Sequence, residues 1–152
     1  MRHFSQSLAP ARTGDIVEYD ELWSFVVSKA QRVWIWIALC RRTKQVVAYY
    51  LGDRTKESFK IFYAKVPIDY ANCLSTSDGL EVYRVLKIYG HSMSKKKQGR
   101  TSQVEAFNTI LRQRLARLVR KTCAFSKSME MHEIVIRWFI QQYNEDILSV
   151  IY

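Results

Sequence analysis

The sequence predicts a single α/β domain in which helices flank a mixed sheet. Its length of 152 residues and its apolar content of 48% suffice for one hydrophobic core. The first half holds runs rich in Val, Ile, Trp and Phe, residues that favour pleated strands. The second half holds apolar residues at helical spacing, which indicates long amphipathic helices.

Three strands are expected in succession near the N-terminus. Ile16 to Tyr19, followed by Leu22 to Val27, has the composition of a first strand. Val33 to Leu39 has the unbroken apolar pattern of a strand that is covered on both faces. A polar turn then leads into Val46 to Leu51. Because the connections are short, these segments predict an antiparallel meander.

A helix and a short fourth strand are expected next. Thr55 is suited to cap a helix over Lys56 to Lys65, which carries an apolar stripe. Ala71 to Ser75 is predicted to be a strand that leads to Asp78, and Glu81 to Lys87 is predicted to be a short helix. An acid directly after a strand lies at the carboxyl edge of the sheet, where ligands collect in mixed and parallel sheets.

Two long helices are expected in the C-terminal third. Tyr89 to Arg100 is predicted to be a strand remnant followed by a basic loop. Thr101 or Ser102 is then expected to cap a helix that runs to about Lys121. A final helix is expected over about Ser128 to Tyr143. The first of these helices carries apolar residues at offsets 0, 3, 7, 11 and 14, namely Val104, Phe107, Leu111, Leu115 and Leu118.

These elements divide the chain into three parts. Residues 1–14 are polar and small, with no clear period, and are expected to be a linker or a frayed lead-in. Residues 15–145 hold the predicted sheet and helices and form the domain that carries any site. Residues 146–152 are expected to be a C-terminal tail.

Charge and cysteine content narrow the class of protein. The chain has 24 Lys and Arg against 14 Asp and Glu, a net charge of +10 that favours a polyanionic partner such as nucleic acid. Cys40, Cys73 and Cys123 are far apart, which argues against a disulfide framework and a zinc ribbon. The longest apolar run, Val33 to Cys40, is too short to span a membrane. A reducing cytoplasm is the expected compartment.

Charged residues on and near the first long helix are candidates for chemistry. A polar face at offsets 0, 3, 4 and 7 consists of Glu105, Asn108, Thr109 and Arg112. Glu105 has the position that a metal ligand needs, and Arg112 is suited to hold a phosphate. Candidate contacts to nucleic-acid phosphates are Lys95, Lys96, Lys97, Arg114, Arg117, Arg120 and Lys121. The alternative for all of them is a solvated surface with ordinary ion pairs.

Several other polar residues are expected to have structural roles. Glu21 adjoins Asp20, but alternation along a strand predicts that it points to the opposite face, away from any metal. Asp15 and Glu18 are expected to face solvent. His132 is expected to lie on a helix surface or at a helix cap, because no paired-histidine metal motif accompanies it.

Six short motifs follow one another in a recognisable order. They are Asp20 to Val26, Gly52 to Thr55, Thr76 to Gly79, Val104 to Asn108, Leu111 to Thr122 and Phe125 to Glu133. Together they closely resemble the catalytic half of insertion-sequence-one transposases, a family of Asp-Asp-Glu transposases, over about Gly14 to Asn144. A single Asp-Glu pair would be a weak signal, whereas the ordered set with its Arg-rich segment is highly specific.

The resemblance implies a ribonuclease-H-like fold and a DNA transposase that cuts and joins insertion-sequence ends. By motif, Asp20, Asp78 and Glu105 match the three metal-binding acids of the family, and Arg112 matches its basic residue seven places after the Glu. Mg²⁺ or Mn²⁺, as two ions, is the implied cofactor. The implied partners are double-stranded DNA, as element ends and target, and further copies of the chain when active. The implied location is the bacterial cytoplasm, in association with the nucleoid.

Two departures from the family pattern bear on these expectations. Leu80 stands where the family commonly carries a Trp, and Asp78 and Glu105 are 27 positions apart (105 minus 78), slightly more than usual. Related full-length transposases also resemble a fusion with an upstream zinc-ribbon and helix-turn-helix part, and no such cysteine cluster or recognition helix is visible in this sequence. One alternative is therefore a catalytically inactive DNA-binding or regulatory remnant. The other is an unrelated basic RNA-binding domain, although the aromatic signatures of common RNA-binding modules are missing.

Overall fold

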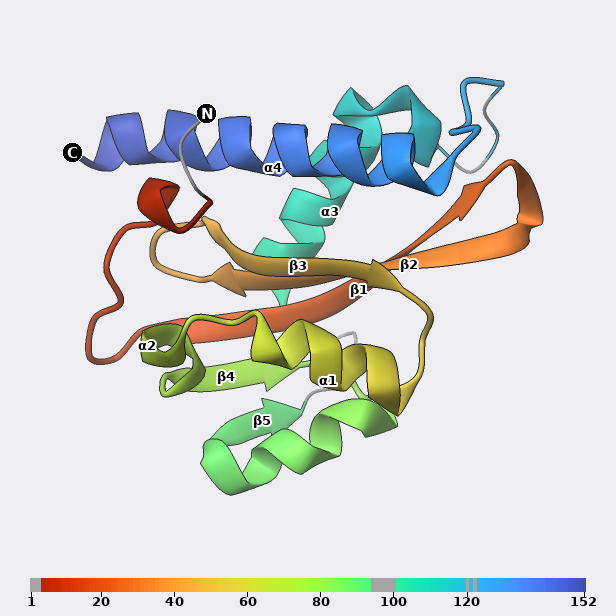
Figure 1. The fold of residues 1–152 in the computed structure, drawn as a ribbon. Coiled ribbons are helices and arrows are strands. Elements are labelled where there is room, and N and C mark those ends of the chain that lie inside the picture. The colour runs from red at the N-terminus through yellow and green to blue at the C-terminus, as the bar shows by residue number, and fades with distance from the viewer. Residues whose placement is uncertain (1–3, 94–100, 120, 122) are drawn as a thin grey trace.

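The computed structural model describes residues 4–93, 101–119, 121 and 123–152, and its centre is a five-stranded mixed sheet (Figure 1). The strands are β1 Ile16–Val26, β2 Ser28–Cys40, β3 Val46–Gly52, β4 Leu74–Ser77 and β5 His91–Met93. Their order across the sheet is β3-β2-β1-β4-β5. β1, β2 and β3 form the predicted antiparallel meander, whereas β4 and β5 run parallel to β1. The predicted mixed sheet of a ribonuclease-H-like fold is confirmed.

Helices cover both faces of this sheet (Figure 1). One face carries α3 (Ser102–Arg114) and α4 (Met129–Ile151). The other carries α1 (Lys56–Ala64) and the 3-10 helix η2 (Glu81–Tyr89). Three short helical segments complete the described fold, namely η1 (Phe4–Ser7), α2 (Ile68–Ala71) and η4 (Ala116–Leu118).

Two apolar layers hold the sheet to these helices. In the layer toward α3 and α4, Ile35 of β2 is buried with Phe107 and Ile140 of the helices. In the opposite layer, Trp36 of β2 is buried with Phe62 of α1. Because Ile35 and Trp36 are neighbours that point to opposite faces, β2 is covered on both sides, as its unbroken apolar run predicts.

The segment between β3 and β4 follows the prediction with one shift. Thr55 caps α1 as predicted, since its Oγ1 accepts a hydrogen bond from the backbone N–H of Ser58 at 3.3 Å. The fourth strand was expected over residues 71–75, but β4 begins only at Leu74. Pro67 stands at the N-cap of the short helix α2, which occupies the chain as far as Ala71 and so displaces the strand.

The first long helix is shorter than its apolar spacing predicts. α3 ends at Arg114 instead of near Lys121, and Leu115 has extended dihedrals of φ −107° and ψ 98°. The chain then turns through η4, where Leu118 is buried. The carbonyl oxygen of Leu118 accepts a hydrogen bond from Arg112 Nη1 at 3.0 Å, which holds the turn against the helix. Leu115 and Leu118 therefore reach the core from a turn rather than from a continuing helix.

The described part of the expected lead-in packs against the fold. The ring of Phe4 meets the ring of Tyr49 edge to face, with centroids 5.6 Å apart. The backbone N–H of Ala9 donates to Oε1 of Gln45 at 2.8 Å. The partners of this segment, Tyr49 in β3 and Gln45 just before it, lie far away in sequence. Local composition therefore gives no sign of these contacts and predicts a linker.

The last helix is longer than predicted. α4 continues to Ile151 instead of ending near Tyr143, so most of the expected tail is helical. Asn144 anchors the helix, because its side chain accepts a hydrogen bond from the N–H of Val46 at 2.9 Å and donates to the Val46 carbonyl at 2.8 Å. The division into domain and tail stays a prediction.

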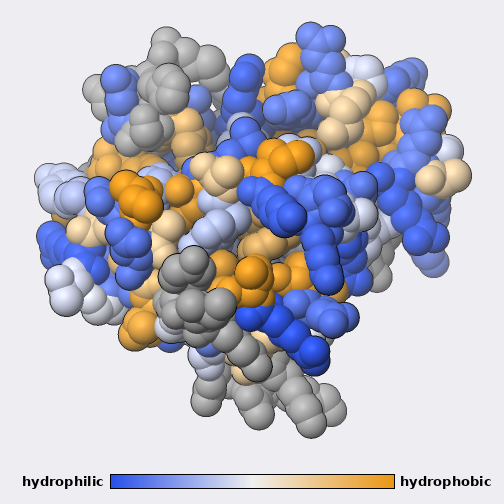
Figure 2. Space-filling view, turned by 60° about the horizontal axis from the view of Figure 1, so that its bottom comes forward, coloured by the Kyte–Doolittle hydropathy of each residue, from blue (hydrophilic) through white to orange (hydrophobic). Residues whose placement is uncertain are grey.

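Polar residues and smaller apolar groups are mixed on the face of the molecule that Figure 2 shows. Figure 2 shows hydrophilic residues spread over much of one face, with smaller apolar groups between them. Exposed apolar side chains include those of Ile68 and Trp138. Among the described residues, no helix has both the length and the apolar character that crossing a membrane requires.

Candidate functional site

Asp20 and Asp78 meet where β4 ends. Asp20 lies in the central strand β1, and Asp78 directly follows β4. β4 pairs with β1 only as far as Tyr19, which lies opposite Ser77. Beyond Tyr19, β1 has no partner strand on this side within the described residues, so the sheet opens there. The two acids thus lie together at the sheet edge that the sequence predicts.

A third carboxylate, from Glu21, joins them. One oxygen each from Asp20, Glu21 and Asp78 lies within 4.8 Å of the others, and these three residues are called the acid group below. Glu21 does point to the α1 side of the sheet, where its Oε2 accepts a hydrogen bond from Tyr83 Oη at 2.8 Å. The prediction that Glu21 lies away from the metal-binding acids is nevertheless wrong. Beyond Tyr19 no neighbouring strand among the described residues lies beside β1 at this edge, so carboxylates from its two faces can approach each other.

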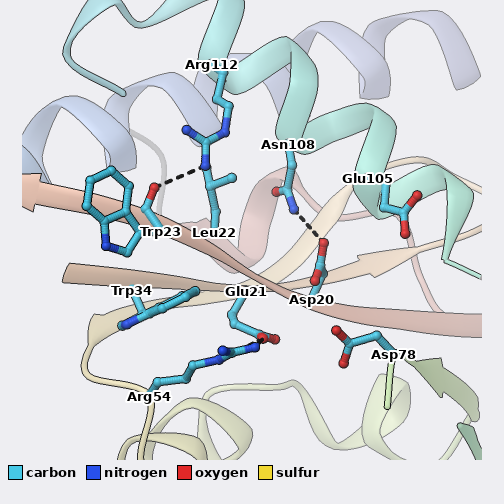
Figure 3. A pocket seen from close by; sticks show the side chains of 10 residues that line it. All are labelled: Asp20, Glu21, Leu22, Trp23, Trp34, Arg54, Asp78, Glu105, Asn108 and Arg112. Carbon is cyan, nitrogen blue, oxygen red and sulfur yellow. Dashed lines mark hydrogen bonds and ion pairs between the residues drawn. The ribbon is translucent and has the colours of Figure 1, made fainter. Parts of the chain in front are cut away.

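Glu105 reaches the same opening from the first turn of α3. Figure 3 shows its side chain with those of Asp20 and Asp78 around one cleft. Glu105 lies outside the 4.8 Å acid group, and its Oε1 accepts a hydrogen bond from Thr101 Oγ1 at 2.9 Å. The three predicted acids therefore line one cleft, two from the sheet edge and one from a helix.

Glu18 fixes the position at which α3 begins. Its side chain is fully buried, and its Oε2 accepts hydrogen bonds from the backbone N–H groups of Gln103 and Val104, both at 2.9 Å. Its Oε1 accepts from Arg41 Nε at 2.7 Å. The expectation that Glu18 faces solvent is wrong, because its charge lies against the positively polarised start of a helix. Glu18 thereby ties β1 to α3, the two elements that carry Asp20 and the helical acid.

Asn108 connects α3 directly to Asp20. Its Nδ2 donates to Asp20 Oδ2 at 2.8 Å, as the dashed line in Figure 3 marks. Asn108 is only 7% exposed, and its Oδ1 is the one buried side-chain polar atom without a hydrogen-bond partner among the described residues. A buried acceptor without a partner is costly, so such an atom beside a cleft calls for a functional explanation.

Burial and mutual repulsion make the acid group difficult to ionise fully. The pKa of Asp20 is raised to about 7, first by burial and then by the charge of Glu21. Asp78 and Glu105 raise it further. Burial also raises the pKa of Glu21, and repulsion by Asp78 adds to this, while a hydrogen bond from Arg54 opposes it. A bound cation would relieve this repulsion, and oxygen-only ligands suit hard ions such as Mg²⁺.

The cleft is open and has a volume of about 440 Å³. It is lined by Asp20, Glu21, Leu22, Trp23, Trp34, Arg54, Asp78, Glu105, Asn108 and Arg112 (Figure 3). Nη2 of Arg112 donates to the backbone oxygen of Trp23 at 3.2 Å, which keeps its guanidinium at the cleft wall. Arg112, which the helical spacing singled out, therefore lines the cleft. Its contact with a phosphate stays a prediction.

Only part of the predicted nucleic-acid surface falls within the described residues. Arg114 and Lys121 are exposed, whereas Arg117 is half-buried and donates to Ser126 Oγ at 3.2 Å. Because α3 ends at Arg114, these cations do not share one continuous helix face. The remaining candidates, Lys95, Lys96, Lys97 and Arg120, lie outside the described residues.

Two further polar residues that were expected at the surface are buried. Asp15 pairs with Arg42, whose Nε lies 2.6 Å from its Oδ1, and hydrogen bonding to Arg42 lowers the pKa of Asp15. His132 is fully buried between two hydroxyls, with Ser24 Oγ 3.0 Å from Nε2 and Ser126 Oγ 2.7 Å from Nδ1. Burial lowers the pKa of His132 to about 4. Sequence spacing gives no sign of the Asp15–Arg42 pair or of the Ser24–His132 contact, because these partners are 27 and 108 positions apart in the chain.

Comparisons with known proteins place the chain in a family. A family model described as IS1 transposase matches residues 15–145. The insertion element iso-IS1n protein InsB of Shigella dysenteriae is 39% identical over 132 residues, which cover 84% of this chain and 95% of the relative. The insertion element IS1 4 protein InsB of Escherichia coli (strain K12) is 37% identical over 125 residues, or 81% and 72% of the two chains. The insertion element IS1 protein InsB of Shigella sonnei is 36% identical, over 81% and 92%. The chain belongs to the IS1 transposase family.

Proposed function

We propose that this chain is the catalytic part of a DNA transposase that cuts and joins insertion-sequence ends by metal-dependent phosphoryl transfer. The observation that carries the proposal is the meeting of Asp20, Asp78 and Glu105 in one cleft at the open edge of the sheet. One acid comes from a strand, one from the residue after a strand and one from a helix, and they converge there although they are distant in sequence. Membership of the IS1 transposase family supports transposition as the biological process.

The donors of the cleft fit Mg²⁺ or Mn²⁺, bound as two ions. Asp20 and Asp78 belong to the acid group and would hold the ions together with Glu105. All three donors are carboxylates, the ligands that hard divalent cations prefer. When bound, such ions supply charge stabilisation at the phosphate and lower the pKa of an attacking water.

The chain's own residues hold and orient the reacting groups. Asn108 fixes one carboxylate oxygen of Asp20, and Glu18 sets the position of α3 and hence of Glu105. Arg112 at the cleft wall would hold a DNA phosphate. The reaction is an in-line displacement in which the oxygen of a water or a 3′-hydroxyl forms a bond to phosphorus while the opposite P–O bond breaks. No covalent protein intermediate is required.

Double-stranded DNA is the proposed partner, both as element ends and as target. The net charge of +10 attracts phosphates. Arg114 ends α3, and Arg117 and Lys121 follow it, where they would extend that attraction. The active form is proposed to be a homo-oligomer that acts on the nucleoid in the bacterial cytoplasm.

The test is cleavage and joining of fluorescently labelled end DNA in Mg²⁺, by the chain alone and by the chain joined to a zinc-ribbon and helix-turn-helix segment. Asp78→Asn keeps side-chain size but removes a metal ligand, so it is expected to fold and to give no product. The matched control Asp146→Asn, at an exposed position of α4, is expected to retain activity. Equal product from native and Asp78→Asn chains would remove Asp78 from the chemistry, and no product from either would favour a catalytically inactive remnant.

A further inference from the structure

Two tryptophans line the cleft that holds the acids. Trp23 of β1 and Trp34 of β2 are directly opposite each other in the antiparallel pair, so their side chains project from the same face of the hairpin. Both are half-buried, whereas Trp36, two residues further along β2, is fully buried in the core. Figure 3 shows the two rings at one end of the cleft, with Trp34 next to Glu21 and Asp78 at the other end.

Charged residues of the cleft contact the ring of Trp34 and the backbone of Trp23. The guanidinium carbon of Arg54 lies 4.5 Å from the ring centre of Trp34. The same guanidinium donates to Glu21 Oε1 through Nη2 at 2.6 Å and through Nε at 3.1 Å. On the other strand, Arg112 donates to the backbone oxygen of Trp23. The ring of Trp34 is therefore coupled to the acid group through the Arg54–Glu21 ion pair, with Arg54 over one of its faces, whereas Arg112 fixes the backbone of Trp23.

We infer that Trp23 and Trp34 form a subsite for one unpaired nucleobase of the DNA strand next to the phosphate that reacts. A base has a flat apolar face that stacks on an indole ring, and stacking accepts any base. A phosphate in the same place would face the acid group, whereas an uncharged base would not be repelled. Figure 3 shows Arg112 beside Trp23 and Arg54 beside Trp34, where they would meet the phosphates before and after that base.

This subsite deepens the proposed function, since it lies beside the proposed catalytic acids. Its occupation requires the strand to be unpaired at this point, which costs free energy that the stacking contact returns. Binding of the base needs neither metal nor cleavage, so it can be measured without the reaction. The ligand class is a single-stranded or locally unpaired DNA segment, and fully paired duplex is the comparison.

The experiment measures binding of the whole chain to labelled duplex DNA with or without a short unpaired flank, in EDTA, by fluorescence anisotropy. 2-Aminopurine in the flank reports stacking, because its fluorescence is quenched against an aromatic ring. Native protein is expected to quench it and to bind the unpaired DNA more tightly than the paired DNA. Trp23→Leu and Trp34→Leu should each weaken that binding about tenfold, within the range of about 5- to 150-fold for loss of one stacked base.

Matched variants separate stacking from a structural effect. Trp23→Phe and Trp34→Phe retain a ring and should stay within about threefold of native affinity, because a smaller aromatic ring still stacks. Trp138→Leu removes an exposed indole from α4, away from the cleft, and should change neither affinity nor quenching. Asp78→Asn should keep the quenching even where cleavage is lost, so failure of the proposed chemistry does not hide the subsite.

Three results would overturn the inference. One is absence of quenching by the native chain, which decides the question even if a Leu variant fails to fold. Another is equal affinity of native and Leu variants for the unpaired DNA when their thermal melts agree. The third is an equal loss of affinity for paired and unpaired DNA, which would assign the two rings to the shape of the hairpin rather than to a base.

Discussion

Glu18→Gln tests how α3 is held over the sheet. In the native chain the fully buried carboxylate accepts hydrogen bonds from Arg41 and from two backbone N–H groups, those of Gln103 and Val104. Glutamine has nearly the same shape but only one acceptor oxygen. If that oxygen stays with the helix, the new NH₂ group faces the guanidinium of Arg41, and two donors then oppose each other.

The loss is expected to be about 2–4 kcal/mol in free energy of unfolding. A hydrogen bond to a charged group contributes about 1.5–3 kcal/mol, and a negative charge at a helix N-terminus contributes about 0.3–1 kcal/mol more. Arg41 limits the loss, because its side chain is 35% exposed and can turn to water. For a chain of this size, about 2–4 °C of melting temperature corresponds to each kcal/mol, so a fall of roughly 4–16 °C follows.

Urea unfolding followed by circular dichroism gives the free energy directly. The matched control is Glu81→Gln, because Glu81 is 73% exposed and lies 3.7 Å from Arg84 in a surface pair. That control should change stability by less than about 0.5 kcal/mol. A Glu18→Gln chain as stable as the control would refute the idea that this carboxylate anchors α3.

Three further predictions concern pH, repulsion and salt. Because the pKa of His132 is about 4 in the folded chain against 6.5 normally, its contribution to stability is present above pH 6.5 and is lost as the pH falls toward 4. Native protein should lose about 2 kcal/mol more than His132→Gln between pH 7 and pH 5 in urea titrations, and parallel curves would exclude this. Asp78→Asn should gain about 1 kcal/mol at pH 8 without divalent ions, since repulsion in the acid group falls, and a loss of stability on urea unfolding would contradict that. Replacing Arg114, Arg117 and Lys121 together by Ala should reduce the slope of log affinity for DNA against log salt by about 1 to 3, and an unchanged slope would assign these residues to solubility.

Local sequence patterns predicted most of the sheet. Val33 to Leu39 has no polar break because β2 is covered on both faces, and this pattern is visible in any single sequence. Asp78 is recognisable because an acid and a Gly directly follow a short strand. Asp20 and Glu105 were singled out by the order of the motifs, since composition does not separate them from the other acids.

Contacts between distant residues could not be predicted in the same way. Glu18 and Gln103 are 85 positions apart, and a buried strand glutamate has the same local pattern as an exposed one. The end of α3 was missed because Leu115 and Leu118 keep helical spacing while reaching the core from a turn. Glu21 was assigned to the correct face, but the early end of β4, which lets its carboxylate meet Asp78, depends on tertiary structure.

The most direct test of the central claim is a change of metal preference at Asp78. Asp78→Cys replaces a hard carboxylate by a softer thiolate, which binds Mg²⁺ poorly but accepts softer ions such as Mn²⁺ more readily. Cleavage of labelled end DNA by this variant is expected to fall to background in Mg²⁺ and to recover at least about tenfold in Mn²⁺, with native protein active in both. Native-like cleavage by Asp78→Cys in Mg²⁺ would contradict the assignment of Asp78 as a ligand of the catalytic metal.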